Sequence, residues 1–159
     1  MLDGPLLVLT VVAALGCGLM AGAFFVFSVM VMPALARLPP AQGIAAMQAI
    51  NVAAVRPWFM AGLFGPAAAC VALAVWSVAR WGEPGAVHLL VGSLIYLVGA
   101  IVLTVVFHVP RNDALATVEP TSADAERHWA RYVSTWTAGN HVRALASLAA
   151  AATLTLAIR

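Results

Sequence analysis

Hydrophobic residues lie in four long runs along the chain, separated by short polar segments. The runs cover about residues 6–32, 58–79, 86–107 and 139–158. A helix needs roughly 20 residues to cross about 30 Å of hydrocarbon, and each run is close to that length. Because the connecting segments are too short to bury cores of their own, we expect a single domain over residues 1–159. The pattern therefore predicts an all-α fold, an integral membrane four-helix bundle.

Two of the connections carry helical patterns of their own. After the first run, one helical face holds apolar residues and two amides, formed by Ile44, Met47, Gln48, Asn51, Val52 and Val55. A helix too short to cross the membrane lies in the interface or folds back against the bundle, so these amides either bond to water or face a pocket. The later connection, residues 119–136, predicts an amphipathic helix that leads into the fourth run.

Prolines and small residues indicate where the apolar helices end and touch. Proline lacks the backbone N–H that continues a helix, so we expect the first helix to end at Pro33, Pro39 and Pro40 and the third helix to end near Pro110. In the first helix Ala14, Gly18 and Gly22 recur every four residues. That spacing allows another helix to approach closely, either within the chain or in a homo-oligomer.

The polar residues of the last run share a helical face with aromatic residues. At 100° per residue, a stripe about 100° wide holds Trp129, Tyr132, Val133, Trp136, Asn140 and Arg143. His141 lies about 100° away from Asn140. The apolar stretch after Arg143 is about five residues shorter than a full span, which places Asn140 and Arg143 near the hydrocarbon boundary. There Arg143 either faces the bundle interior or extends to the headgroups.

The composition agrees with a membrane protein, because 64% of the residues are hydrophobic and only 9% are charged, against roughly 25% charged in soluble domains. All eight basic residues are arginines, and six lie in or beside the two longer connections, namely Arg37, Arg56, Arg111, Arg127, Arg131 and Arg143. The positive-inside rule places these connections, with the amphipathic helix, in the cytoplasm and both termini outside the cell (inner) membrane. No basic run contains interleaved aromatics, so we expect no nucleic-acid partner.

Familiar catalytic signatures do not occur in the sequence. It has no Glu-x-x-His, His-x-x-x-His or Cys-x-x-Cys spacing, no nucleophile elbow and no glycine-rich phosphate loop. His108, His128 and His141 are a weak set of possible metal ligands, and we expect no metal. The remaining polar and aromatic groups suit a flat, apolar aromatic or lipid-like ligand with a few oxygens. The candidate binding residues are Gln48, Asn51, Asn112, Tyr132, Trp136 and Asn140.

Four segments resemble, in order and spacing, the anthrone-oxygenase-like family of small four-helix membrane proteins. They are "GLMAGAFFVFSVMVMPALARLPP", "MQAIN", "VPRNDALA" and "WTAGNHVRALASLAAAATL". The most specific pieces are Pro110-x-Asn112 with Leu115, and Trp136 with Asn140-x-x-Arg143. The resemblance implies oxidation of an anthrone to an anthraquinone with O2 as co-substrate and without a flavin or haem, so no cofactor is expected.

A mechanism follows from this resemblance. His141, which belongs to the "NHVR" pattern, is the expected general base that takes a proton from the substrate. Arg143, with Asn140 and Asn112, would stabilise the developing oxyanion. His108 is the weaker candidate, because the resembling proteins often carry asparagine at its position.

Two other interpretations stay open. In one, the protein is a non-enzymatic membrane module that binds a lipid, a quinone or a partner protein through the same polar residues. In the other, Asn112, Asn140 and Arg143 are structural and bond carbonyl groups left free by proline between helices 3 and 4.

Overall fold

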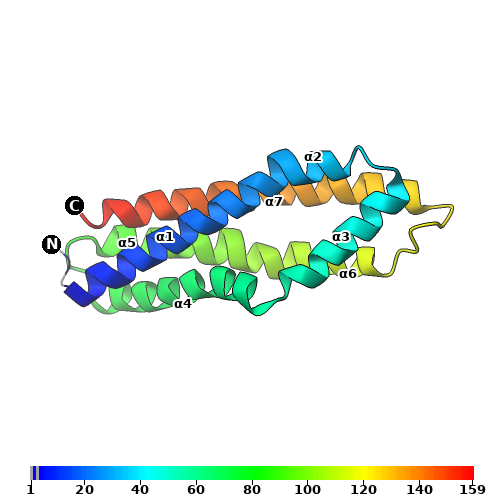
Figure 1. Cartoon of the computed structure of the whole chain (residues 1–159). Coiled ribbons are helices and arrows are strands. Elements are labelled where there is room, and N and C mark those ends of the chain that lie inside the picture. The colour runs from blue at the N-terminus through cyan, green and yellow to red at the C-terminus, as the bar shows by residue number, and fades with distance from the viewer. Residues whose placement is uncertain (1, 3) are drawn as a thin grey trace.

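The computed structural model describes residue 2 and residues 4–159, and this part of the chain is helical without any strand. The all-α class is therefore confirmed. Four long helical rods run side by side (Figure 1). The first rod consists of α1 (Gly4–Val26), η1 (Phe27–Val31) and α2 (Met32–Leu35), and the second is α4 (Pro57–Ala79). The third consists of α5 (Ala86–Tyr96), η2 (Leu97–Val102), η3 (Thr104–His108) and α6 (Val109–Ala116), and the fourth is α7 (Ala125–Leu156). The helix α3 (Pro40–Ala54) joins the first rod to the second.

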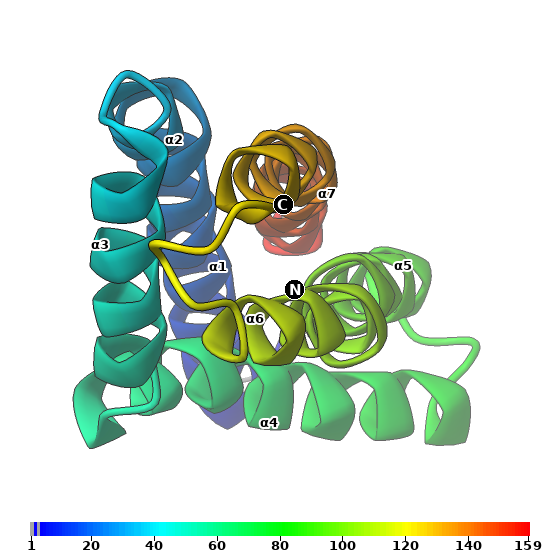
Figure 2. The ribbon, with the colours of Figure 1, turned by 90° about the vertical axis from the view of Figure 1, so that its right-hand side faces the viewer.

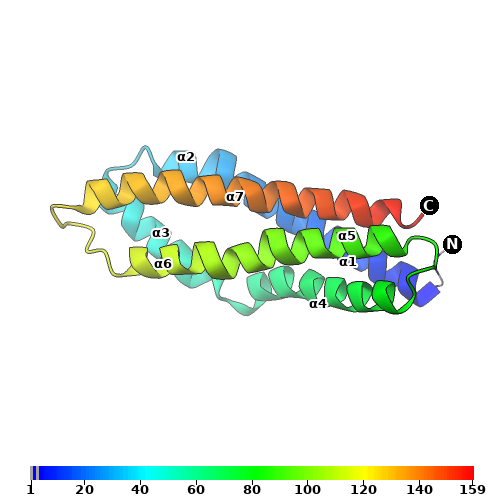
Figure 3. The same cartoon turned by 180° about the vertical axis from the view of Figure 1, so that it is seen from behind.

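The rods alternate in direction, which brings both termini to one end of the molecule (Figure 1). α1 packs against α4 and α7, and α5 packs against the same two helices. At the opposite end α3 folds back against α6 and α7 (Figure 2). Of the two expected positions for this segment, in the membrane interface or against the bundle, the structure has the second. The expected amphipathic helix and the fourth run form the single helix α7 (Figure 3).

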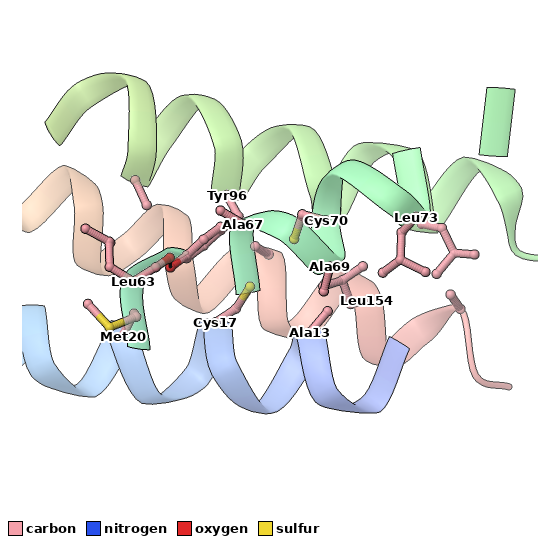
Figure 4. Packing of buried hydrophobic residues seen from close by; sticks show 14 of the residues in the cluster. Ala13, Cys17, Met20, Leu63, Ala67, Ala69, Cys70, Leu73, Tyr96 and Leu154 are labelled. Carbon is pink, nitrogen blue, oxygen red and sulfur yellow. Dashed lines mark hydrogen bonds between the residues drawn. The ribbon is translucent and has the colours of Figure 1, made fainter. Parts of the chain in front are cut away.

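Three rods are long and apolar enough to cross a membrane, at Gly4–Leu35, Pro57–Ala79 and Ala86–Ala116. Small and medium-sized side chains fill the space between the rods near the termini (Figure 4), including Ala13, Cys17, Cys70, Leu73 and Leu154. Both cysteines are buried in this core. The Tyr96 hydroxyl donates a hydrogen bond of 2.9 Å to the Leu63 carbonyl and ties α5 to α4.

The first helix passes Pro33 and ends at Leu35, before Pro39 and Pro40, as expected. The expected helix end at Pro110 is wrong, because this helix continues past the proline. A proline ring clashes with the carbonyl four residues earlier and leaves it without a donor. In each rod a π-helical stretch precedes the proline, with the N–H of Met32 bonded to the Phe27 carbonyl and that of Val109 to the Thr104 carbonyl. These wider turns accommodate the rings, so the rods extend to Leu35 and Ala116.

Two predicted packing faces are also corrected. Along α3, Ile44 and Met47 are buried, but Val52 and Val55, the residue after the helix end, are exposed, so the apolar face is packed only in its first half. On α1, a Cβ at Gly18 or Gly22 would have nothing within 4 Å. Neither glycine therefore forms a close helix contact within the described chain, and a homo-oligomer through this ridge stays a prediction.

A close contact between rods does occur at Gly99, where a Cβ would lie 2.3 Å from the Cβ of Ala146. We expect Gly99→Ala to force the rods apart and to lower the free energy of unfolding by about 1–3 kcal/mol. The matched control is Gly18→Ala, which fills open space and gains helix propensity of up to about 1 kcal/mol. Unfolding in detergent micelles measures both, and equal stability of the two variants would contradict this packing.

Candidate active site

A cavity of about 330 Å³ lies at the α3 end of the bundle, enclosed by α3, the start of α4, the η3–α6 segment and the inner faces of α1 and α7. This volume is within the range of small-molecule sites. Its walls are mainly apolar, and they include Phe24, Phe27, Met47, Phe59, Met60 and Leu63. The polar lining groups are few, namely Asn51, Thr104, His108, Asn112, Asn140 and Arg143.

Arg143 is a buried cation without a carboxylate partner. Its side chain is only 6% exposed, and the one salt bridge among the described residues joins Arg127 to Asp124 on the surface. Its Nη1 donates to Thr104 Oγ1 at 3.0 Å, and the guanidinium carbon lies 4.3 Å from the centre of the Phe24 ring. Nε is buried and has no partner in the described chain. Arg143 therefore faces the interior of the bundle, and the residue lines the cavity.

Asn140 holds Arg143 in place. Its Oδ1 accepts a bond of 2.6 Å from Arg143 Nη2, while its Nδ2 donates to the Phe24 carbonyl at 2.7 Å and to Ser28 Oγ at 2.8 Å. Both ends of the amide are thus engaged within the protein. Asn140 was predicted to bind substrate, but this geometry makes it a residue that positions Arg143. The structural interpretation expected Asn140 to bond a backbone carbonyl between helices 3 and 4. The carbonyl that it bonds is that of Phe24, in helix α1.

Asn112 is oriented by two aromatic side chains of α7. Its Oδ1 accepts hydrogen bonds from the Tyr132 hydroxyl at 2.9 Å and from Trp136 Nε1 at 3.0 Å. Burial raises the pKa of Tyr132, so the phenol stays a neutral donor. Asn112 lines the cavity, and because its oxygen already accepts two bonds, its NH2 group is the part of the amide left to bond a ligand.

His108 also lines the cavity, although its sequence context made it the weaker candidate. The side chain is 1% exposed, and neither ring nitrogen has a hydrogen-bond partner within residues 4–159. The ring packs edge to face against Phe107 and Trp136, with centroid distances of 5.2 and 5.1 Å. On its other side the backbone of Gly139 comes close, since a Cβ there would lie 3.1 Å from His108 Nε2. The His108 ring is therefore buried at the wall of the cavity, between Phe107, Trp136 and the backbone of Gly139.

The sequence did contain a signal for His108. It stands four residues before Asn112, so the two share one face of a continuous helix. The assumption that Pro110 ends the helix hid this relation.

Three of the expected site residues do not face the cavity. His141 is exposed and borders a shallow hollow with Met32 and Pro33, because it is a third of a turn away from Asn140. Gln48 donates from Nε2 to the carbonyls of Leu115 and Val118 at 2.9 and 3.0 Å, which caps the end of α6. Tyr132 acts through Asn112, as described above.

The remaining predicted residues are placed as follows. Asn51 lines the cavity, and its Nδ2 is buried without a partner in the described chain. Trp136 lines it with its ring. His108, His128 and His141 lie in three separate hollows, and no three metal-binding side chains cluster among the described residues.

Comparison with known proteins decides the family. The model of the anthrone oxygenase family matches residues 56–153, more than half of the chain. The chain belongs to the anthrone oxygenase family. No curated protein and no solved structure matches it significantly. Within the anthrone oxygenase match lie Thr104, His108, Asn112, Asn140 and Arg143, whereas the walls from α1 and α3 lie outside it.

The role of Asn140 can be tested by Asn140→Ala. This change leaves the Phe24 carbonyl and Arg143 Nη2 without their partner, and each buried group left unpaired costs about 1–3 kcal/mol. We expect a clear fall in the free energy of unfolding, measured in detergent. His141→Ala, one residue along on the exposed face, is the control and should change stability by less than about 0.5 kcal/mol. Equal effects of the two changes would refute the positioning role.

Proposed function

We propose that the protein is a membrane-embedded oxygenase that converts a flat anthrone-like or phenolic substrate into a quinone with O2. The observation that carries the proposal is one apolar cavity whose lining residues His108, Arg143 and Asn51 each have a buried nitrogen without a hydrogen-bond partner among the described residues. A buried polar group without a partner is costly, so such a set is typical of a site that a ligand completes. Membership of the anthrone oxygenase family supports the same substrate class.

The cavity walls fit a planar aromatic molecule. Phe24, Phe27 and Phe59 offer aromatic surface for a ring system. Arg143 Nε and the Asn112 amide are donors for oxygen atoms at the edge of that ring system. Such a division between apolar walls and a few directed donors gives both affinity and orientation.

The chemistry begins with a proton transfer. His108 takes a proton from the methylene carbon of the anthrone, and the electron pair moves onto the carbonyl oxygen as an aromatic anthrolate. Arg143 and Asn112 stabilise that negative charge with hydrogen bonds in a dry site, where they are strong. His108 replaces His141 in this role because His108 lines the cavity and His141 does not.

The anthrolate then supplies the electrons that reduce O2. One oxygen atom becomes the new carbonyl oxygen, and the other leaves as water with the two hydrogens of the former methylene group. The sum is anthrone plus O2 giving anthraquinone plus water, and this balance requires no separate reductant. The proposal therefore includes O2 as co-substrate and no cofactor.

Placement in the membrane follows the helices and the charges. We propose α7 as a fourth crossing, which the interior position of Arg143 makes acceptable because ionisable groups in spans face the bundle. Trp58 and Trp81 are 89% and 60% exposed at the two ends of α4, and the 23 residues of α4 span about 34 Å. Such aromatic pairs mark both interfaces. The α3 end, which carries most of the arginines, is then cytoplasmic, with both termini outside the inner membrane.

Activity tests the enzymatic proposal directly. Membranes that contain the protein should consume O2 with an anthrone and form the quinone, with one atom from 18O2 in the product. We expect His108→Ala to lower kcat by about 10²-fold or more, the usual contribution of a general base. His141→Ala is the matched histidine control and should keep full activity. Unfolding curves of both variants exclude loss of folded protein as the cause.

Other outcomes separate the alternatives. Full activity of His108→Ala with loss in His141→Ala would return the general base to His141. A tightly bound quinone or lipid without any turnover would contradict the enzyme and favour a binding module that uses the same cavity.

Cysteine labelling tests the topology. Ser122→Cys and Arg159→Cys place thiols at the two ends of α7, and the native Cys17 and Cys70 are fully buried. In intact cells a membrane-impermeant maleimide should label Arg159→Cys, and it should label Ser122→Cys only after permeabilisation. Labelling of both in intact cells would show that α7 does not cross.

A further inference from the structure

A second hollow of about 280 Å³ lies between α6 and the first turns of α7. Three of its lining residues are basic, Arg111, His128 and Arg131, and none of the lining residues is acidic. Its other walls include the apolar side chains of Leu115 and Val118. The hollow thus combines uncompensated positive charge with an apolar wall.

The nearby acidic side chains do not neutralise this charge. Asp124 pairs with Arg127, and Glu119 accepts a hydrogen bond from Thr121. Both line a neighbouring hollow, which shares Ala114, Val118 and His128 with this one. In the described part of the chain, Arg111 and Arg131 form no salt bridge.

Arg111 is held in a fixed orientation. Its Nη1 donates to the Phe107 carbonyl at 2.8 Å, and its guanidinium carbon lies 3.4 Å from the centre of the Phe107 ring. Arg131 is exposed on the facing helix α7, directly before Tyr132 and one turn before Thr135. An anion that enters the hollow therefore meets one anchored and one exposed guanidinium.

The position of the hollow indicates the source of the anion. α6 and the start of α7 lie at the end opposite both termini (Figures 1 and 3), which is the cytoplasmic end in the proposed topology. Basic pockets between transmembrane helices on that side bind lipid headgroups. Leu115 and Val118 offer the apolar contact that a lipid has and a free ion lacks.

We propose that this hollow binds the phosphate headgroup of an anionic phospholipid. The site is separate from the cavity of the proposed oxygenase and does not depend on that activity. Lipid binding here would fix the angle between α6 and α7 at the membrane surface.

The test uses purified protein equilibrated with equal amounts of phosphatidylglycerol and phosphatidylcholine, with retained lipid measured by native mass spectrometry. We expect the parent protein to retain phosphatidylglycerol preferentially. Arg111→Gln with Arg131→Gln should reduce that preference about tenfold or more, because each arginine near an anionic lipid contributes roughly fivefold. The control is Arg37→Gln with Arg56→Gln, which removes the same charge from exposed positions outside the hollow and should keep the preference.

Two results would overturn the proposal. Equal loss in both double variants would mean that only the overall charge attracts the lipid. Displacement of the lipid by millimolar inorganic phosphate would identify a soluble anion as the ligand. If the double variant does not fold, Arg131→Gln alone replaces it in the test, because Arg131 is exposed and its change should not affect folding. This single variant should lower the preference for phosphatidylglycerol by about fivefold.

Discussion

The site depends on one buried charge, the guanidinium of Arg143. Without a carboxylate, it is stabilised by neutral dipoles and an aromatic face, from Thr104, Asn140 and Phe24. A buried ion of this kind destabilises the fold strongly if one of its partners is removed. Asn140 is itself anchored on the Phe24 carbonyl and on Ser28. The charge therefore ties three rods together and leaves positive potential beside a largely apolar cavity, where developing negative charge is strongly stabilised.

The shape of that cavity depends on two prolines. Pro33 and Pro110 each follow a π-helical stretch. The first stretch contains Ser28, which accepts a hydrogen bond from the Asn140 amide. The second contains His108, which lines the cavity. A wider turn changes the helical phase after it and creates room beside it. The features that look like helix ends in the sequence are thus the features that bring the imidazole to the site.

Helical periodicity predicted which residues share one face of a helix, but it could not predict which groups of a second helix these residues bond. The stripe of α7, from Trp129 to Arg143, is buried except for Val133, which is partly buried, and Arg143 takes the interior one of its two expected positions. The partners of the amides were out of reach, because a helical face says nothing about which groups lie opposite. Gln48 caps α6 and Asn140 clamps Arg143, and both depend on tertiary packing. His108 was ranked below His141 because the resembling proteins often carry asparagine at its position, and the helix that continues through Pro110 and places His108 on one face with Asn112 was not predicted.

The central claim is that Arg143 and His108 face a bound planar substrate. The most direct measurement is an experimental structure of the protein with a hydroxylated anthraquinone, the product class of the proposed reaction. We expect the ligand inside the cavity, with one oxygen about 3 Å from a nitrogen of Arg143 and with the opposite carbonyl beside the His108 ring. A ligand outside the cavity, or one whose oxygens point away from both side chains, would contradict the claim.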